Sequence, residues 1–444
     1  MKPNRWARGA VGRWSAGRWA AGGALACLVG AGVFLGIAHR SGLPTVPTPK
    51  AADFPAELVS RGATLATIGD CIVCHTADGG AAYAGGRALA TPFGTLYSTN
   101  ITPDPETGIG GWSKEAFKRA MRDGVSRDGR HLYPALPYDH YRRVHDGDLD
   151  AIYAFLMTRP AVAAPAKAND LLFPLGFRPL LAGWKLLFLH QEEFTPRPDR
   201  DAEWNRGAYL AEGLGHCSSC HSPRNLAGAE KTGDGAYAGG VAEGWVAPAL
   251  NGSSPSAVPW TADSLFTYLR TGVDGRHGAA AGPMGPVVHG LSRAPEADVR
   301  AIAGYIASLS ADRAGAAVNT AAPLPPDRAD EASRANPAGA ALFAGACAGC
   351  HEGGAPMMTQ GRPGLSTVTA LQLDQPDNAI RAILQGIHPP TGPAGPTMPP
   401  FAASLTDAQV ADLAAYLRTR FSDRPAWTSL EAASATVRKE ESQP

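Results

Sequence analysis

Three short stretches of the chain follow one pattern: CIVCH at residues 71–75, CSSCH at 217–221 and CAGCH at 347–351. In a C-x-x-C-H motif two thiols attach a haem covalently, and the adjacent histidine is placed to bind its iron. A thioredoxin-like redox pair needs no trailing histidine, and a zinc site would need a second pair of ligands at short range. No such pair follows the motifs. The sequence therefore predicts three covalently bound haem c groups.

Each predicted haem uses two cysteines and one proximal histidine. The attaching cysteines are Cys71, Cys74, Cys217, Cys220, Cys347 and Cys350. The histidines expected to bind iron are His75, His221 and His351. Only Cys27 is left of the seven cysteines, so the chain has no ligands for iron–sulfur clusters and no nucleotide fingerprint. Any substrate chemistry must then belong to other subunits, and we expect no catalytic residue here.

Composition sets broad limits on fold and partners. A length of 444 residues allows two to four domains. The formal net charge is zero, so nothing indicates a nucleic-acid partner. With Gly 52 and Pro 38, about a fifth of the chain favours loops. Small, loop-rich domains of this kind need something besides side chains to fill their cores.

The surroundings of the three motifs repeat as well. A helix-like stretch precedes each motif, and an amphipathic helix with an early acid closes each unit (DLDAIYAFLMTRP, EADVRAIAGYIASLS and DAQVADLAAYLRTRF). Tyr153, Tyr305 and Tyr416 occupy the matching place in these closing helices, where we expect core packing. This layout resembles class I cytochrome c. The predicted fold class is all-α, with three tandem cytochrome c domains behind an N-terminal hydrophobic segment.

The domain boundaries follow from shifts in composition. The predicted segments are a basic stretch, hydrophobic segment and linker (1–50), unit one (51–165), a connecting segment (166–202), unit two (203–312), an Ala/Pro-rich linker (313–336), unit three (337–427) and a polar, frayed tail (428–444). The connecting segment contains LLAGWKLLFL at 180–189, which is too short to span a membrane. It is either a helix packed between units one and two or a docking surface for a partner or the lipid interface.

The N-terminus predicts a compartment. Residues 1–18 carry five basic residues and no acid, and residues 19–38 carry no charge. That length matches a bilayer span with its basic flank in the cytoplasm, which predicts an anchor in the inner membrane and an exported remainder on the periplasmic side. A cleaved signal peptide is the competing interpretation.

A methionine is expected to bind the other face of two haems. Thioether sulfur raises a haem's potential, and the ligand should come from the loop before the closing helix. Met398 in GPTMPPF and Met284 in GPMGPV both lie there, flanked by prolines that stiffen the loop. We therefore predict Met284 and Met398 as iron ligands in units two and three.

Unit one differs at this position. Its approach sequence matches that of unit two, but Leu136 in YPALPYDHY stands where the sulfur should arrive. His140, four residues further on, is the first choice for the sixth ligand. Met121, Met157, or an open or water-bound iron are the alternatives. Histidine on both faces would lower the potential of this haem relative to the others.

These residues resemble a known family. Three CxxCH units, together with RGAYLAEGLGHCSSCHSPRN, GWVAPALNG and TMPPFAASLTDAQVADLAAYLRTR, look like the membrane-associated triheme cytochrome c subunits of bacterial periplasmic dehydrogenases. The resemblance covers residues 55–427. It implies electron transfer from a catalytic dehydrogenase subunit to ubiquinone or a terminal oxidase. YPALPYDHY and LLAGWKLLFL resemble most the branch paired with molybdenum hydroxylases, with quinoprotein and flavoprotein partners as the other possibilities.

Two rival functions stay open at this point. A free-standing electron shuttle would need no catalytic partner. A haem enzyme that reduces peroxide or binds a gas would use an open haem in unit one.

Overall fold

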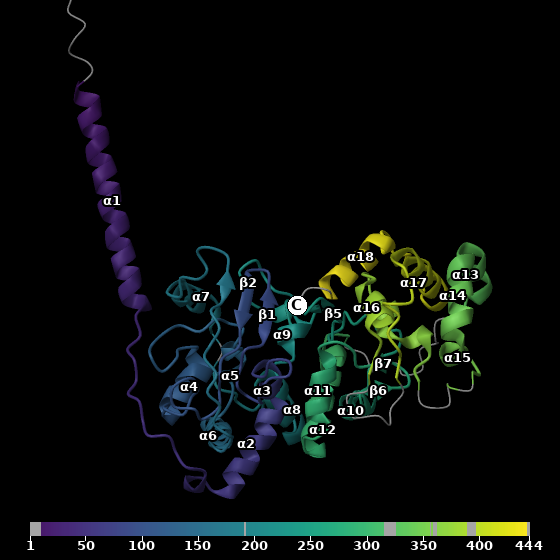
Figure 1. Ribbon diagram of the computed structural model, residues 1–444, viewed down its shortest axis with the longest axis horizontal. Helices are drawn as coiled ribbons and strands as arrows, with labels where there is room; N and C mark the ends of the chain where they lie inside the picture. The colour runs from purple at the N-terminus through teal and green to yellow at the C-terminus, as the bar shows by residue number, and fades with distance from the viewer. Residues whose placement is uncertain are drawn as a thin grey trace, which may run out of the picture.

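The computed structural model describes residues 10–190, 192–314, 326–355, 357, 362–388 and 397–441. The first helix, α1 (Ala10–Ala38), extends away from the body of the molecule (Figure 1). Its C-terminal end contacts the helix α7 (Leu180–Phe188) of the connecting segment. The loop after α1 is tied to unit one, because the backbone N–H of Leu43 donates to the carbonyl of Arg127 (2.7 Å).

The predicted anchor in the inner membrane is contradicted by the structure. Within the described residues, no helix is both long enough and apolar enough to cross a bilayer. A span needs about 20 predominantly apolar residues. The described side chains of α1 run only from Gly22 to Ala38, and five of them are glycines. The side chains of residues 1–21, which include the basic stretch, lie outside the described part of the chain.

The rest of the chain is mainly helical, as predicted. Unit one contains η1 (Ala51–Asp53), α2 (Ala56–Ile68), α3 (Cys71–Cys74), β1 (Ala88–Thr91), β2 (Gly94–Tyr97), α4 (Lys114–Asp123), α5 (Tyr138–Tyr141) and α6 (Asp146–Met157). Unit two contains α8 (Ala202–Glu212), α9 (Ser218–His221), η2 (Gly233–Gly235), β4 (Gly240–Ala242), β5 (Trp245–Ala247), α10 (Ala262–Thr271), β6 (Val273–Asp274), β7 (Gly278–Ala279), α11 (Met284–Leu291) and α12 (Glu296–Ala314).

Unit three and its flanks complete the element order. They contain α13 (Ala329–Ala335), α14 (Pro337–Leu342), the π-helical turn η3 (Phe343–Cys347), α15 (Ala348–His351), η5 (Leu365–Thr367), η6 (Thr369–Leu371), α16 (Asp377–Gln385), α17 (Asp407–Phe421) and α18 (Leu430–Glu441). The C-terminal tail is therefore not frayed up to Glu441. Val437 and Ser434 of α18 are fully buried, and Arg438 pairs with Asp407 of α17 (2.9 Å).

Short strand pairs are the departure from an all-α fold. β1, β2 and β3 (Asp170–Leu171) form a three-stranded antiparallel sheet in which Leu89 faces Leu96 and Thr95 faces Asp170. β4 pairs with β5, and β6 pairs with β7, both antiparallel. All lie in the glycine-rich loops between the helices, where turns bring neighbouring backbone segments into register.

One helix crossing recurs three times, in α2 with α6, α8 with α12 and α14 with α17. A glycine of the first helix lies against a carbonyl of the second at each crossing, because a Cβ there would overlap it. The pairs are Gly62 with Ala151, Gly207 with Ala301 and Gly339 with Asp412. The side chain four residues later in the closing helix also meets the glycine, and it belongs to Phe155, Tyr305 and Tyr416.

Phe155, rather than the predicted Tyr153, is thus the residue of unit one that corresponds to Tyr305 and Tyr416. The expected core packing of the tyrosines is nevertheless confirmed, because Tyr153, Tyr305 and Tyr416 are all buried. Tyr153 also donates a hydrogen bond to the carbonyl of Trp112 (2.7 Å).

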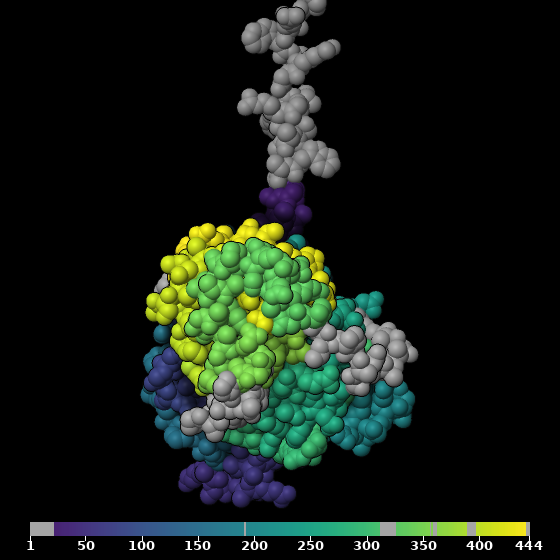
Figure 2. Space-filling view, turned by 90° about the vertical axis from the view of Figure 1, so that its right-hand side faces the viewer, coloured from purple at the N-terminus to yellow at the C-terminus, as the bar shows by residue number. Residues whose placement is uncertain are grey.

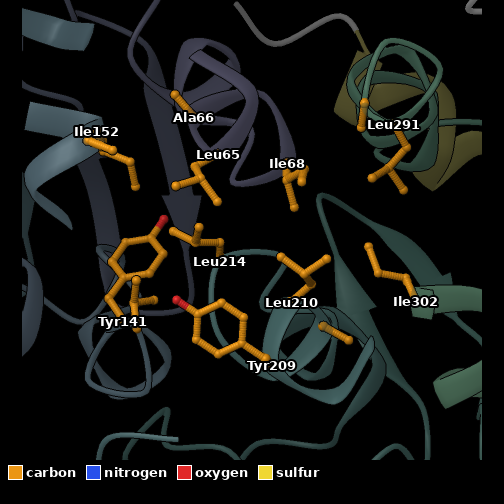
Figure 3. Close-up of a cluster of buried hydrophobic side chains, with 14 of the residues drawn as sticks. Leu65, Ala66, Ile68, Tyr141, Ile152, Tyr209, Leu210, Leu214, Leu291 and Ile302 are labelled. Carbon is orange, nitrogen blue, oxygen red and sulfur yellow. The ribbon is translucent and has the colours of Figure 1, made fainter. Parts of the chain in front are cut away.

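Units one and two share a hydrophobic core, whereas unit three has its own. Leu65 and Ile68 of α2 and Leu210 of α8, with Leu214 just after it, lie in one buried cluster at this junction (Figure 3). Unit three forms a separate lobe that faces the viewer in Figure 2. It joins unit two through Asn378, whose side-chain amide makes two hydrogen bonds to the backbone of Val246 (2.8 Å each).

The helix α7 packs on unit one, and its outer face is exposed. Trp184 contacts Tyr138 edge-to-face, and its indole N–H donates to the carbonyl of Ala227 in unit two (2.9 Å). Leu186 and Leu187 face solvent. The structure therefore combines both interpretations of this segment: a helix packed against the units, with an apolar face left free.

Candidate haem attachment sites

Each CxxCH motif lies on a short helical turn just after the first helix of a crossing. α3 begins at Cys71, Cys217 is the N-cap of α9, and the π-helical turn η3 delivers Cys347 to α15. The sharp entry in unit one uses the left-handed backbone of Asp70 (φ 52°). The crossings thus hold the attaching residues at the same place relative to each helix pair.

The proximal histidines of units one and two are oriented alike. His75 Nδ1 lies 2.6 Å from the carbonyl oxygen of Thr99, and His221 Nδ1 lies 2.7 Å from that of Pro248. Since a carbonyl oxygen only accepts, Nδ1 carries the proton in both rings and Nε2 keeps its lone pair. Burial lowers the pKa of both histidines, which favours the neutral ring that a metal ligand requires. These residues fit an iron ligand.

Unit three differs in its orienting contact. His351 Nδ1 is buried and has no hydrogen-bond partner among the residues described. The following Glu352 is held by Arg420, which lies 2.6 Å from one carboxylate oxygen and also pairs with Asp327 (2.7 Å). The turn after CAGCH is therefore fixed through Glu352.

The cysteines do not resemble a metal centre. All are free thiols, and burial raises the pKa of Cys71 and Cys217 to about 12 and of Cys347 to about 11, so they stay protonated. Zinc binds the thiolate. The one metal-like group of His, Cys, Asp and Glu side chains in the described residues is Asp139, His140 and Glu230, which includes no cysteine.

The backbone shows that Leu136 occupies the place of Met284. The N–H of Leu132 donates to the carbonyl of Gly124, and the N–H of Ala280 donates to that of Gly272, each at 2.7 Å. Four residues beyond these matching bonds stand Leu136 in unit one and Met284 in unit two. Both side chains are partly buried against the shared core.

The methionines predicted for units two and three are both held by local structure. Met284 is the first residue of α11, directly after Pro283. Met398 exchanges two backbone hydrogen bonds with Ile387 (2.9 Å each) and is partly buried against the core of unit three. Most of the loop before it, residues 389–396, lies outside the described residues.

The alternative sulfur donors of unit one are core residues. Met121 of α4 and Met157 of α6 are both buried among the apolar side chains of the shared core. His131 is buried too, with Nε2 2.8 Å from the carbonyl of Ala38 and Nδ1 3.0 Å from Lys185 Nζ. Its ring is therefore used in structural contacts.

His140 is held at the junction of units one and two. Its Nδ1 lies 2.8 Å from the carbonyl oxygen of Glu212, and its Nε2 lies 2.8 Å from Glu230 Oε1. Burial lowers the pKa of His140, but the Glu230 carboxylate outweighs burial and raises it to about 9. Sequence reasoning missed Glu230, because it lies 90 residues away and belongs to another unit.

Comparison with known proteins agrees with this geometry. A cytochrome c family model matches residues 59–160 and 337–420. The chain is 50% identical over 421 residues to a nicotinate dehydrogenase subunit of Pseudomonas putida, covering 94% of this chain but 35% of that protein. It is 38% identical over 405 residues to the gluconate 2-dehydrogenase cytochrome c subunit of Pantoea cypripedii, covering 86% of this chain and 90% of that subunit.

A further relative is the cytochrome c subunit of the quinone-dependent alcohol dehydrogenase of Gluconacetobacter polyoxogenes. It is 36% identical over 387 residues, covering 84% of this chain and 82% of that subunit. The chain therefore belongs to the family of cytochrome c subunits of dehydrogenases, which transfer electrons within a dehydrogenase complex and are not its catalytic subunits.

Proposed function

We propose that the chain binds three haem c groups covalently, one in each unit, and conducts single electrons through them. The observation that carries this proposal is the repeated site: a CxxCH turn after a glycine crossing, with Nδ1 of the following histidine held by a carbonyl in units one and two. Haem c supplies a one-electron couple when bound. The chain's own residues fix its attachment, its axial ligands and its burial.

The ligand sets are proposed as follows. His75, His221 and His351 bind iron from one face, and Met284 and Met398 bind the other face in units two and three. Since thioether ligation raises the potential, these two haems would have the higher potentials.

The proposed partner is a molybdenum hydroxylase that oxidises an N-heterocycle or an aldehyde. The 50% identity with a protein named for nicotinate supports this choice over a quinoprotein or a flavoprotein. We propose ubiquinone or a terminal oxidase as the acceptor, and a periplasmic location. Co-purification of the chain with a molybdenum-containing subunit tests the partner, and recovery of the chain without any catalytic subunit would favour a free-standing shuttle.

A second function applies to unit one. Leu136 offers no lone pair, and both ring nitrogens of His140 are already in hydrogen bonds. This haem is thus the candidate for binding an external ligand. Rapid binding of CO by a third of the reduced haem at neutral pH would support that function, and its absence would contradict it.

Haem content tests the main proposal directly. The mature polypeptide, expressed with a haem-attachment system, should exceed its amino-acid mass by three haem groups. Replacing both cysteines of one motif by alanine should remove one haem and leave two. A wild-type mass equal to the polypeptide alone would overturn the proposal.

A further inference from the structure

His140 contacts only unit two with its ring nitrogens, although it belongs to unit one. It lies in α5, four residues after Leu136, and its side chain is 7% exposed. Nδ1 faces the carbonyl of Glu212, which only accepts, so Nδ1 carries a proton. Nε2 faces the carboxylate of Glu230, which is itself 10% exposed. With both nitrogens donating, the ring has no lone pair to offer an iron atom.

The other carboxylate oxygen of Glu230 leads to the second attachment site. Glu230 Oε2 accepts a hydrogen bond from Ser218 Oγ at 2.8 Å. Ser218 is the residue after Cys217, inside CSSCH. Arg224 lies 3.7 Å from Glu230 Oε1 and adds a positive charge on this side. A continuous chain of contacts thus joins the Leu136 loop of unit one to the CSSCH turn of unit two.

The surroundings bring the first two motifs to the same junction. The ring of His216, next to Cys217, packs edge-on against His140 (6.3 Å) and Tyr141 (6.1 Å). A Cβ on Gly69, two residues before Cys71, would lie 3.5 Å from the carbonyl of Leu214. Movement of the Leu136 loop is therefore resisted by residues that flank both CIVCH and CSSCH.

We propose that His140 is a positioning residue rather than an iron ligand, and that His140, Glu230 and Ser218 hold the loop of residues 133–141 against the CSSCH turn of unit two. This inference rests on the proposed function in that both sites carry haem. It goes beyond it because it assigns a coupling between the two sites that neither motif has alone.

The chain offers a matched control for this junction. His145 Nδ1 pairs with Glu193 at the same 2.8 Å, but the two side chains are 45% and 50% exposed. His145→Ala removes a histidine–glutamate pair of the same length from the same part of unit one without touching the CSSCH turn. An exposed pair contributes little, so this variant should behave as wild type.

The experiment compares His140→Ala, Glu230→Gln and His145→Ala in the full haem-loaded chain. In His140→Ala, near-infrared magnetic circular dichroism should show the wild-type set of axial ligands. The midpoint potentials of the haems in units one and two should shift, and that of unit three should not. Hydrogen exchange of residues 138–144 should become about tenfold faster or more, because local opening loses a buried tether.

Glu230→Gln keeps an acceptor for His140 and should give smaller changes of the same sign, even if His140→Ala folds poorly. Loss of a nitrogen-ligand signature in His140→Ala would overturn the proposal in favour of iron ligation. Exchange and potentials equal to those of His145→Ala would overturn it as well. Failure of the proposed function is distinguishable, since it would appear as missing haem mass in the wild-type chain.

Discussion

The loop that carries Leu136 in unit one and the loop that carries Met284 in unit two start from the same backbone hydrogen bond and end in different chemistry. In unit two the tip is a thioether, and the residue four positions later is the buried Val288. In unit one the tip is a hydrocarbon, and the residue four positions later is His140, which bonds across the unit junction. One scaffold thus serves an iron ligand in one unit and an inter-unit contact in the other.

The largest effect is expected from Leu136→Met, which gives unit one the tip of unit two. Leu and Met have similar volumes, so the fold should tolerate the change. We expect a third His/Met signature and a rise in the potential of this haem on the order of a hundred millivolts or more, because axial ligands set haem potentials over about 0.8 V. Magnetic circular dichroism and redox titration measure both effects. An unchanged spectrum would show that the two loops differ in more than their side chains.

Much of this comparison could be predicted from sequence, because it depends on local patterns. The approach sequences of the two loops match, so the place of Leu136 followed from alignment with Met284. The helix crossings followed from apolar spacing and from the glycines before each motif. The helix α18 did not, because its only large apolar residues, Leu430 and Val437, form a narrow stripe in a polar stretch.

Contacts between units could not be predicted. The partner of His140 depends on how unit one packs on unit two, and nothing near YPALPYDHY specifies Glu230. The same holds for Lys185, whose apolar surroundings in LLAGWKLLFL conceal an ammonium group directed into unit one. Periodicity describes one element at a time, whereas these contacts join elements that lie tens of residues apart.

The next effect tests whether the scaffolds are truly equal. A Cβ at Gly207 would overlap the carbonyl of Ala301, as one at Gly62 would overlap that of Ala151. Gly207→Ala and Gly62→Ala should each lower the free energy of unfolding by about 2–3 kcal/mol, the cost of forcing atoms into a filled contact. Denaturant titration of the full chain measures this.

Gly304→Ala is the matched control within the same crossing. Nothing lies within 4 Å of the added Cβ, and Gly304 is inside α12. This change should stabilise the chain by about 0.5–1 kcal/mol, because glycine is the poorer helix former. If Gly207→Ala were as harmless as Gly304→Ala, the crossing would not be a close contact.

A support for the Leu136 loop comes from Lys185, and Lys185→Met removes it. The ammonium donates to the carbonyls of Asp123 and Gly124 (2.6 Å each) and lies 5.0 Å from the centre of the Tyr138 ring. Loss of these bonds should cost about 2 kcal/mol, because buried carbonyls lose their partner. Faster hydrogen exchange around residues 124–138 should accompany the loss, and unchanged protection there would contradict the role.

The same lysine gives the protein a pH dependence. Burial lowers the pKa of Lys185 to about 7, with Asp123 opposing and Arg40 assisting the shift. Between this value and the ordinary pKa of about 10.4, the unfolded chain binds more protons than the folded chain. The free energy of unfolding should therefore rise with pH from about 7 to 10, and Lys185→Met should flatten that rise. A slope identical in both proteins would show that Lys185 does not cause it.

The smallest effect is expected at the surface of the junction between units one and two. Arg87 lies 3.0 Å from Glu243, but Glu243 is 58% exposed and sits on the turn between β4 and β5. Solvent screens such a pair, so Glu243→Gln should change the free energy of unfolding by less than about 0.5 kcal/mol. The potentials of the haems should also stay at their wild-type values. A larger effect from Glu243→Gln than from Glu230→Gln would mean that the two units are held together from the rim rather than through the buried contacts beside the two attachment turns.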